Sequence, residues 1–586
     1  MSQDKQRLEK IRHSLSHLMS MAVLEIYPKA GLGVGPVIDN GFYQDYDLPE
    51  SISEEIFSKL EKRMKEMIKQ KIDFVQHNVD FDNALSEYKD DPYKSELIRD
   101  LKKAGEENVS FYRSDWFENL CKGPHVKNTL EINPEAFKLT QIAGAYWRGS
   151  EKNKMLTRIY GVAFATKEEL EKYLWREEEA KKRDHRKLGQ ELDLFIFAED
   201  VGPGLPLWTP RGTIIKDELE KWAKETEEQW GYVRVSTPHI ARHTLYETSG
   251  HLPYYKDDMY RPMDIDGEDY YLKGMNCPHH HMIFKSSPKS YRDLPLRFAE
   301  YGMVYRYEQS GVLFGLMRVR AINQNDAHIY CALEQAEEEF LQVLKLHEYY
   351  YNKLGLTKND YHIVIGLPDE AKRDKYHGDK ALWDKAEKMM RGAIEKSEIK
   401  SVEDVGGAAF YGPKIDFVIT SSIGREFAIS TNQLDLYMPT RFNLEYTDRD
   451  GAKKLCAVIH RAPLGSHERF IGFLIEHFAG AFPVWLSPVQ VCFAPVSTDK
   501  HLDGTKKLAQ EFKDAGIRVE VDKADETVGN KVRKAIAQKV PYILVVGDKE
   551  LSGEDLMIRV RGEEKQIKMG KDEFVSKVKE EIEKRK

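Results

Sequence analysis

The sequence predicts a mixed α and β fold divided into several domains. A chain of 586 residues is too long for one hydrophobic core, since roughly 150 residues per domain is typical. Hydrophobic residues make up 41% and charged residues 32%, as in a folded globular protein rather than a disordered one. Strand-like and helical segments are interspersed along the chain, so we expect a multidomain α+β protein.

Four regions differ in their patterns, and we expect each to be a unit. Residues 1–165 mix short strands with helices. Residues 166–192 have helical spacing with charges on most faces, which predicts a solvated connector helix. Residues 193–487 contain strand-like segments such as YHIVIGL, KIDFVIT and REFAIS between long helical inserts. Residues 488–586 alternate apolar strands (VCFAPV, IRVEVD, PYILVVGD) with amphipathic helices, which predicts a compact α/β domain.

The composition favours a cytoplasmic location without a membrane span. The N-terminal segment MSQDKQRLEKIRH is charged and is followed by no apolar segment of the kind found in secretory signals. We find no run of about eighteen apolar residues, the length that a membrane helix needs. The five cysteines are scattered and odd in number, which favours a reducing compartment over a disulfide framework. The net charge of -8 does not decide nucleic-acid binding, because the local field matters.

Candidate phosphate-binding residues are arginines rather than a glycine-rich loop. GLGVGP at 31–36 matches neither the P-loop nor the dinucleotide-binding pattern, so we interpret it as a structural turn. Arginine is the alternative, because its guanidinium binds phosphate oxygens in pairs. Arg306 and Glu308 lie two apart on an expected strand and so share a face. Arg318 follows shortly after, and Arg469 begins an amphipathic helix after a Gly-Ser turn.

One segment has the residue types of a metal site. KGMNCPHHHMIF at 273–284 places Cys277 just ahead of three consecutive histidines at 279–281. Cysteine and histidine are the usual protein ligands of zinc. From this segment alone, Cys277 could bind a metal with these neighbours, with distant residues, or not at all.

Ordered motifs along the chain resemble those of class II aminoacyl-tRNA synthetases. EKWAKETEEQWGYVRVSTPHI at 220–240 resembles their motif 1, MVYRYE at 303–308 their motif 2, and GSHERFIGFLIEHF at 465–478 their motif 3. The more specific segments MNCPHH, NDAHIY, AFYGPKIDF and VIHRAPLGSHERF together resemble the threonyl-tRNA synthetase family. The resemblance extends from His13 to nearly the C-terminus.

The resemblance implies a fold and a function for each region. It implies a class II antiparallel-sheet catalytic domain at 193–487, an N-terminal editing domain at 1–165 and a C-terminal anticodon-binding domain at 488–586. It implies a threonine–tRNA ligase that activates L-threonine with ATP, transfers it to tRNA(Thr), and hydrolyses mischarged Ser-tRNA(Thr). Motif 1 implies a homodimer. A non-catalytic tRNA- or mRNA-binding paralogue is the alternative, although Arg306 and Arg469 are both present.

The resemblance also implies one zinc ion (Zn2+) per subunit. The family's ligands correspond here to Cys277, His328 and His460. Three nitrogen or sulfur ligands with one open position are typical of a catalytic zinc site. Such an ion can bind the amino group and the hydroxyl of threonine together, whereas an apolar pocket would separate threonine from valine only weakly. A prolyl or seryl enzyme would share motifs 1 to 3 but is not expected to carry this set.

The three histidines at 279–281 then become the weaker candidates. Pro278 fits a first helical position, which places Cys277 at the helix cap. The histidine side chains would point around the first turn and could not all face one ion. We interpret them as polar residues at the start of a helix.

Further substrate contacts follow from the same resemblance. Arg306 is assigned to the α-phosphate, and Arg469 with help from Arg318 to the triphosphate tail. Glu308 is assigned to the adenine amino group, and Mg2+ is expected on the phosphates. Asp326, Tyr411 and Ser466 are assigned to threonine, and Lys414 and Gln433 to the same pocket. The residues counted as catalytic are Arg306, Arg469 and Lys414.

A second, hydrolytic site is expected because serine keeps the hydroxyl and is smaller than threonine. His13 and His17, and also Cys121 and His125, have i, i+4 spacing, which on a helix puts two groups on one face. Alone, this pattern indicates a second zinc site, and that alternative stays open. The resemblance favours a metal-free pocket that hydrolyses Ser-tRNA, with Lys94 as a further member.

Four positions depart from the family pattern. Ile322 stands where an aromatic residue usually stacks on adenine, and Ala428 where glutamine is common, so both bear on ATP binding. Asn119 replaces an aspartate near the editing cysteine and Gln44 replaces a tyrosine, so both bear on editing. The small N-terminal domain that often precedes the editing domain is expected to be absent, because His13 lies too near the first residue.

The C-terminal domain is expected to read splayed anticodon bases rather than duplex grooves. Arg533, Lys534 and Arg559 are candidate contacts. A solvated helix face explains these three residues equally well.

Overall fold

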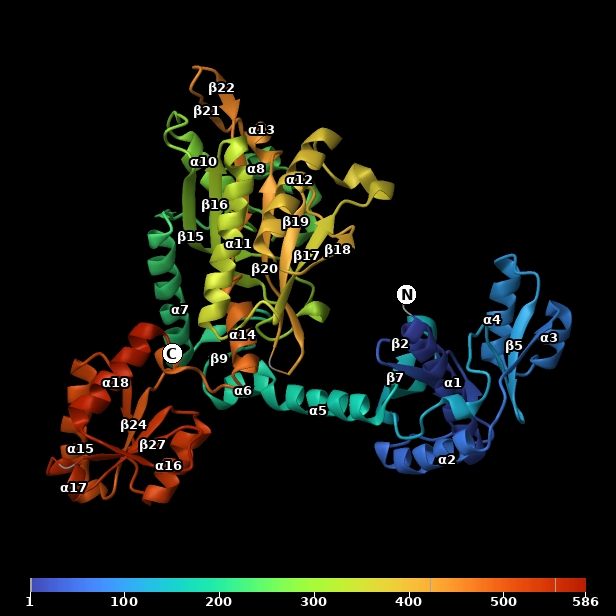
Figure 1. The fold of residues 1–586 in the computed structure, drawn as a ribbon. Coiled ribbons are helices and arrows are strands. Elements are labelled where there is room, and N and C mark those ends of the chain that lie inside the picture. The colour runs from blue at the N-terminus through green and yellow to red at the C-terminus, as the bar shows by residue number, and fades with distance from the viewer. Residues whose placement is uncertain (1–2, 422, 554) are drawn as a thin grey trace. The chain divides into compact units, whose positions relative to one another are not determined.

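The computed structural model describes residues 3–421, 423–553 and 555–586. The chain divides into two compact units, Met1–Glu178 and Glu179–Lys586 (Figure 1). The domain boundaries expected above are finer than this division and remain predictions. Among the described residues, no helix is long and apolar enough to cross a membrane.

Within the described residues, the first unit contains two antiparallel sheets, the helices α1 to α4 and most of α5 (Lys167–Arg183). Its elements are α1 (Gln3–Ile26), β1 (Gly31–Leu32), β2 (Val37–Ile38), β3 (Gly41–Asp47), α2 (Phe57–Lys69), β4 (Val75–Val79), α3 (Phe81–Glu87), α4 (Pro92–Lys103), β5 (Val109–Ser114), β6 (Phe117–Leu120), β7 (Phe137–Tyr146) and β8 (Met155–Ala163). The larger sheet has the order β1-β3-β8-β7, with β2 on β3, and the smaller has the order β4-β5-β6. Leu15, Leu18 and Met19 of α1 pack in one core with Phe42 and Tyr46 of β3, which anchors the helix.

The glycine-rich segment at 31–36 is not the turn that we expected. Gly31–Leu32 form β1, which pairs with β3, and the next residues continue beside β3 without regular structure. The Gly33 N–H donates to the Asp45 carbonyl at 2.8 Å. A Cβ atom on Gly35 would lie 2.0 Å from Oε1 of Gln44, so a larger residue there would displace that side chain. The Gln44 amide donates to the Gly33 carbonyl at 3.1 Å, so this departure from the family pattern helps to hold the segment beside β3.

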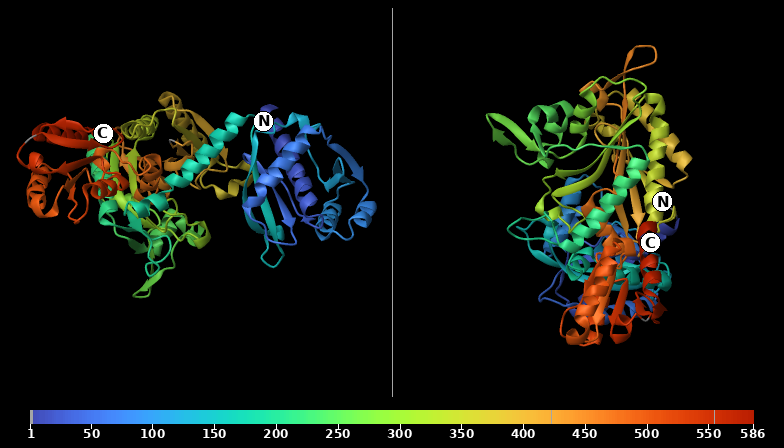
Figure 2. Two further views of the ribbon diagram at one scale, coloured as in Figure 1. Left: turned by 90° about the horizontal axis from the view of Figure 1, so that it is seen from below. Right: turned by 90° about the vertical axis from the view of Figure 1, so that its left-hand side faces the viewer.

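The connector is two helices rather than the single solvated helix that we expected. Helix α5 (Lys167–Arg183) is seen from two directions in Figure 2, and Leu170 is its only residue described as buried. Helix α6 (His185–Glu191) follows after Asp184, whose side chain accepts from the Arg186 N–H at 2.8 Å and so caps α6. Helix α6 buries His185 and Leu188 in the second unit, so this part of the segment is not solvated.

The second unit is organised around an eight-stranded, mostly antiparallel sheet of the order β11-β15-β16-β23-β20-β19-β17-β18. Its strands are β11 (Val233–Arg234), β15 (Leu296–Tyr305), β16 (Ala321–Cys331), β17 (Tyr361–Leu367), β18 (Ser401–Val405), β19 (Lys414–Thr420), β20 (Glu426–Asp435) and β23 (Ala457–Arg461). Its longer helices are α7 (Pro210–Gln229), α10 (Cys277–Lys285), α11 (Ala336–Lys353), α12 (Lys380–Ser397) and α14 (His467–His477). Figure 1 shows α11 lying across the sheet, and its buried residues share one core with the strands.

Smaller elements complete this part of the chain. They are β9 (Phe195–Ile196), β10 (Leu207–Trp208), β12 (Ile240–Arg242), α8 (His243–Ser249), α9 (His251–Tyr254), β13 (Met263–Ile265), β14 (Glu268–Leu272), α13 (Met438–Phe442), β21 (Glu445–Thr447) and β22 (Lys453–Leu455). Three of them form the sheet β12-β14-β13, and two pairs form β-hairpin-like sheets, β10-β9 and β21-β22.

The register of the sheet aligns four predicted site residues in one row. Lys414 of β19 pairs with Gln433 of β20, and Gln433 pairs with His460 of β23. His460 pairs with His328 of β16. Directly opposite residues on neighbouring strands point to the same face, with Cβ atoms about 5 Å apart. Two of the predicted metal ligands and two pocket residues therefore share one face of the sheet.

The C-terminal part forms a sheet of the order β25-β24-β26-β27-β28 with helices around it. Its elements are β24 (Val491–Pro495), α15 (Thr498–Asp514), β25 (Val519–Val521), α16 (Val528–Ala537), β26 (Tyr542–Val546), α17 (Asp548–Leu551), β27 (Leu556–Val560), β28 (Ile567–Met569) and α18 (Lys571–Lys584). The segments VCFAPV, IRVEVD and PYILVVGD contain β24, β25 and β26, which are parallel to one another. The α/β pattern predicted for this region is thus present.

A buried ion pair fastens α7 to the sheet. Arg461 at the end of β23 donates from Nη1 to Oε1 of Glu227 at 2.7 Å, and both side chains are fully buried. Oε1 of Glu227 also accepts from the Asn325 amide of β16 at 2.8 Å, and Arg461 lies over the Tyr232 ring, 4.1 Å from its centroid. Two strands and one helix therefore meet at a single carboxylate.

We predict that Glu227→Met lowers the free energy of unfolding by about 3 kcal/mol, because it leaves the Arg461 charge buried without its partner. Thermal and urea unfolding of the variant measures this loss. The matched control is Glu225→Met on the same helix, where the pair with Arg585 is partly exposed and about 1 kcal/mol or less is expected. Equal losses in the two variants would contradict a special role for the buried pair.

Candidate active site

A cavity of about 340 Å³ lies over the row of paired residues described above. Its walls come from α10, from strands β16, β19, β20 and β23, from the start of α14, and from the segment between β15 and β16, here named the 306–320 loop. All of the expected catalytic, ATP, threonine and metal residues line it: Cys277, Arg306, Glu308, Arg318, Asp326, His328, Tyr411, Lys414, Gln433, His460, Ser466 and Arg469.

The first residues of the 306–320 loop lie beyond the strand on which we expected them. Strand β15 ends at Tyr305, so Arg306 and Glu308 do not share a strand face and instead line the cavity from an irregular segment. Nε of Arg306 donates to the Gly274 carbonyl at 3.4 Å. The Glu308 carboxylate accepts from Nε of Arg318 at 2.8 Å, which joins the two ends of the loop.

Three guanidinium groups converge on one end of the cavity. Ser466 caps α14 and accepts from the Arg469 N–H at 3.2 Å, which places Arg469 in the first helical turn. Burial first, and then the charges of Arg306 and Arg318, lower the pKa of Arg469 from its usual value. Like charges gathered in this way are favourable only when an anion joins them, so this end of the cavity suits a polyphosphate.

The two departures that bear on ATP differ in position. Ile322 lines the cavity. Ala428 contributes its carbonyl, which accepts from Nη1 of Arg469 at 3.4 Å, while its side chain is exposed. Because any residue type supplies a carbonyl, the replacement at 428 does not remove this contact.

The predicted metal ligands meet at the other end of the cavity. Donor atoms of Cys277, His328 and His460 all lie within 4.8 Å of one another, and the three residues are buried. Cys277 is the first residue of α10 and Asn276 precedes it as the cap, so our placement of Cys277 at the cap was wrong by one residue. Burial, together with Asp326 and Asp435, raises the pKa of the Cys277 thiol well above its usual range. A bound cation would favour the thiolate instead.

Hydrogen bonds orient both histidines toward a metal. Nε2 of His460 lies 3.0 Å from the Asp435 carboxylate, which can only accept, so Nδ1 of His460 keeps its lone pair. Nε2 of His280 donates to Glu300 at 3.1 Å, and its Nδ1 can then accept from Nδ1 of His328 at 2.8 Å. The lone pair on Nε2 of His328 is therefore also free to coordinate a cation. Carboxylates behind ligating histidines are typical of zinc sites, so these residues fit the zinc that the resemblance implies.

The three histidines at 279–281 lie at the start of α10, as we had interpreted them. All three are buried, and His280 bonds to the predicted ligand His328. His281 bonds through Nδ1 to the Tyr330 hydroxyl at 2.9 Å. Sequence reasoning ranked His280 as a weak candidate for the site and missed Glu300 and Asp435, because the partners of all three lie on other elements of the fold.

The residues expected to bind threonine line the same cavity. Asp326 accepts from the Asn276 amide at 3.0 Å, and burial raises the pKa of its carboxyl. The Tyr411 hydroxyl donates to the Gln433 side chain. Nζ of Lys414 pairs with Asp416 at 2.9 Å at the cavity wall. These contacts give the cavity polar groups that are already held in position.

A second cluster lies in the first unit. Donor atoms of His13, His17, Cys121 and His125 lie within 4.8 Å of one another. The two histidines at 13 and 17 share α1, as the spacing predicts. Cys121 and His125 are not on a helix but in the segment after β6. They still meet, because Sγ of Cys121 lies 3.2 Å from Nε2 of both His13 and His125.

Burial keeps this cluster in its neutral forms. It raises the pKa of Cys121 to about 11. It lowers the pKa of His17 to about 3, with smaller effects from His13 and from Lys94, which is itself buried. The Ser14 hydroxyl donates to the Lys10 carbonyl and so accepts from Nδ1 of His125, which leaves the lone pair on Nε2 of His125 facing Cys121. Neutral imidazoles of this kind suit either a cation or a proton-accepting role.

Asn119 lies close to this cluster along the chain. It is buried on β6, where it pairs with Tyr112 of β5, whose ring packs against His125 with the centroids 4.4 Å apart. Ser14 is the residue of this cluster that sequence reasoning missed. A serine one residue after a histidine on a helix carries no signal of its own.

Comparisons with protein families match three parts of the chain. The class II core domain of tRNA synthetases for G, H, P, S and T matches residues 260–478. An anticodon binding domain matches residues 490–581. The second additional domain of threonyl- and alanyl-tRNA synthetases matches residues 109–160.

Curated proteins named threonine–tRNA ligase are similar over most of this chain. The protein of Deinococcus radiodurans is 47% identical over 557 residues, covering 94% of this chain and 85% of its own. That of Thermus thermophilus is 46% identical over 566 residues, with the same coverages. Among solved structures, the RNA binding domain of threonyl-tRNA synthetase from Cryptosporidium parvum matches with a TM-score of 0.64 and 34% identity, covering 68% of this chain and 98% of that one.

We predict that His280→Phe weakens zinc binding about 10- to 100-fold, because His328 loses the group that fixes its tautomer and orientation. Competition with a chromophoric chelator measures the affinity. His279→Phe is the matched control, since among the described residues neither ring nitrogen of His279 has a hydrogen-bond partner. An unchanged affinity in His280→Phe, or an equal loss in the control, would contradict the orienting role.

Proposed function

The chain belongs to the threonyl-tRNA synthetase family, and we propose that the cavity between Arg469 and Cys277 is where it forms threonyl-adenylate. Like its relatives, it joins threonine to tRNA with ATP, and it carries a class II core, an anticodon-binding domain and an editing-type domain. The observation that supports the assignment of the cavity is the meeting of three arginines and a cysteine–histidine–histidine set within it.

In the first step the threonine carboxylate attacks the α-phosphorus of ATP. A carboxylate oxygen–phosphorus bond forms, and the bond to pyrophosphate breaks. Arg306 would bind the α-phosphate, while Arg469 and Arg318 would bind the leaving pyrophosphate with Mg2+. Such a displacement depends mainly on positioning and on charge neutralisation, which fixed guanidinium groups supply. Glu308 would accept from the adenine amino group.

In the second step the 3′-terminal ribose hydroxyl of tRNA attacks the carbonyl carbon of the adenylate. An ester forms, AMP leaves, and the hydroxyl proton departs with the leaving group or to solvent. The enzyme forms no covalent bond in either step. Lys414, Tyr411 and Gln433 would keep the adenylate in place between the steps.

Selection of threonine would rest on buried polar groups. Cys277, His328 and His460 would hold a zinc ion, which when bound supplies a Lewis acid with an open position for the amino and hydroxyl groups. Asp326 lines the same cavity and would accept from the threonine hydroxyl. Valine would leave that acceptor unsatisfied, and sites of this kind reject such analogues by about 10⁴. Ser466 would line the same pocket.

Serine satisfies these groups, so the cluster of the first unit would remove it afterwards. A neutral imidazole, His125 or His13, would take a proton from a water molecule that attacks the ester carbonyl of Ser-tRNA. Lys94 would stabilise the negative charge that develops on the carbonyl oxygen. Serine and tRNA with a free 3′-terminal hydroxyl would be the products. His17 and Cys121 would hold the imidazoles in place.

The C-terminal domain would bind the anticodon, and we propose a cytoplasmic homodimer. Arg533 and Arg559 are the stronger of the candidate contacts, because Lys534 is paired with Glu526 at 2.6 Å. The dimer is proposed from the motif 1 resemblance of α7 and β11. Sedimentation of the purified protein measures its oligomeric state.

We predict threonine-dependent exchange between ATP and pyrophosphate, weaker exchange with serine and negligible exchange with valine. Arg306→Ala should lower the rate with threonine about 10²- to 10³-fold, since one transition-state charge contact is lost. Arg533→Ala should leave exchange unchanged and lower only the charging of tRNA. Folded, zinc-loaded protein without exchange for any amino acid would overturn the proposed function and favour a binding role.

We predict that Cys121→Ala accumulates Ser-tRNA and lowers its hydrolysis about 10²-fold, with threonine-dependent exchange unchanged. Deacylation of preformed Ser-tRNA measures the rate, and Cys492→Ala in the C-terminal domain is the control. Metal analysis of the purified protein distinguishes a metal-free hydrolytic pocket from a second zinc site in this cluster. One zinc ion per chain in both forms agrees with a metal-free pocket, whereas two that fall to one in Cys121→Ala would contradict it.

A further inference from the structure

Residues 314–318, here named the tip of the 306–320 loop, pack on the middle of α14. The N–H groups of Met317 and Arg318 both donate to the Phe314 carbonyl, at 2.9 and 3.2 Å, which closes a tight turn. A Cβ atom on Gly472 would lie 3.1 Å from Cε of Met317 and 3.3 Å from Cβ of Leu316. Glycine at 472 therefore leaves the room that the tip occupies.

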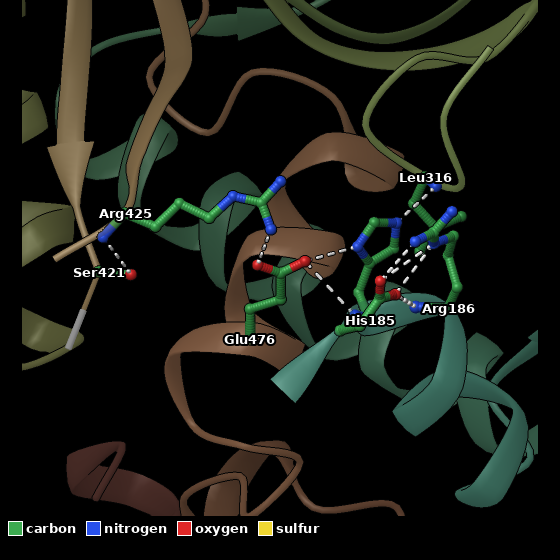
Figure 3. Close-up of polar contacts among 7 residues, drawn as sticks. His185, Arg186, Leu316, Ser421, Arg425 and Glu476 are labelled. Atoms are coloured by element: carbon green, nitrogen blue, oxygen red, sulfur yellow. Dashed lines mark hydrogen bonds and ion pairs between the residues drawn. The ribbon is translucent and has the colours of Figure 1, made fainter. Parts of the chain in front are cut away.

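A buried histidine outside the cavity holds this tip. Nε2 of His185 lies 3.0 Å from the Leu316 nitrogen, and Nδ1 lies 2.7 Å from Oε1 of Glu476 (Figure 3). The Leu316 N–H can only donate, so Nε2 accepts and the ring proton is on Nδ1, facing Glu476. Both side chains are almost completely buried. One tautomer of His185 thus satisfies both contacts at once.

The acid that orients His185 is itself held in place. Glu476 lies near the end of α14, and its Oε2 accepts from Nη1 of Arg425 at 3.0 Å (Figure 3). Arg186, the neighbour of His185, lies over the Phe314 ring, 4.4 Å from its centroid. The start of α6 therefore contacts the tip in two ways. The His185 ring accepts from the Leu316 N–H, and the Arg186 guanidinium lies over the Phe314 ring.

On its other side the tip contacts the ATP end of the cavity. The Met317 carbonyl accepts from Nε of Arg469 at 3.2 Å, and Arg318 pairs with Glu308. Arg469 and Glu476 are on the same helix, seven residues and so about 10 Å apart. The side chains of His185 and Arg469 therefore hold two neighbouring residues of the tip, Leu316 by its N–H and Met317 by its carbonyl.

We propose that His185 is a positioning residue for the reaction with ATP, acting through the backbone of Leu316. It holds the tip against α14, so that the Met317 carbonyl orients the Arg469 guanidinium and Arg318 stays at the cavity. The inference rests on the proposed function of that cavity. Loss of this contact should weaken the use of ATP and change the use of threonine little. The reason is that Asp326 and two of the three predicted metal ligands lie on sheet strands rather than on this loop.

The tip also approaches His185 too closely for most side chains. Gly315 has a φ of 47°, and a Cβ atom there would lie 2.2 Å from Nε2 of His185. Gly315→Ala therefore pushes the tip from the ring while leaving His185 and Glu476 unchanged. This second variant separates loss of the contact from loss of the buried histidine.

The test compares His185→Phe, His185→Gln and Gly315→Ala in the full-length protein, by ATP–pyrophosphate exchange with threonine. We expect His185→Phe and Gly315→Ala to raise the KM for ATP about tenfold or more, with the KM for threonine changed less than about twofold. His185→Gln should recover part of the loss, because its amide oxygen can accept from Leu316. His501→Phe, at a buried histidine of the C-terminal part, is the control for a merely structural effect and should change neither KM.

Hydrogen exchange of the tip gives an independent readout. Peptides covering 312–319 should exchange faster in His185→Phe and Gly315→Ala than in the parent and in His501→Phe. Equal changes in both KM values, or an unchanged tip with an unchanged KM for ATP, would overturn the proposal. If the unsubstituted protein showed no threonine-dependent exchange, the proposed function would fail, and hydrogen exchange alone would then decide whether His185 holds the tip.

Discussion

The register between β16 and β23 is the constraint on which the rest of the second unit depends. It places His328 opposite His460 and Ala327 opposite Arg461. Because successive side chains on a strand point to opposite faces, His460 turns to the cavity while Arg461 pairs with Glu227 of α7. A slip of β23 by one residue would exchange its two faces. It would separate Arg461 from Glu227 and turn His460 away from Cys277 and His328, so the ion pair and the donor set require the same alignment.

Arginines predominate at one end of the cavity and carboxylates at the other, although Glu308 pairs with Arg318 at the arginine end. Arg306, Arg318 and Arg469 gather at one end, while the carboxylates of Asp326 and Asp435 lie near the predicted metal ligands at the other. The net charge of -8 for the whole chain does not reveal this arrangement, which is set by a loop, a helix start and three strands. A substrate pair with a polyphosphate on one side and an amino acid on the other matches it in order.

The sequence predicted the elements and the residues that line the cavity better than the residues that support them. Cys277, His328 and His460 could be found because each lies in a family motif, although no periodicity along the chain brings them together. His280, Asp435 and His185 could not, since their roles depend on partners on other strands and helices. Two errors were avoidable. Asp184 is a capping residue type and marks the break between α5 and α6, and Gly123-Pro124 between Cys121 and His125 argues against a helix there.

The division of the predicted metal ligands among three elements sets the order in which the proposed site can be assembled. Cys277 comes from α10, His328 from β16 and His460 from β23, so no short peptide of this chain contains the complete set. In a zinc finger the metal drives the folding of a small domain, because its ligands are close in sequence. Here the strands must pair before a coordination sphere exists. If the proposed zinc site is correct, a shortage of zinc would therefore leave folded protein with an empty site, which could bind the ion once zinc is available again.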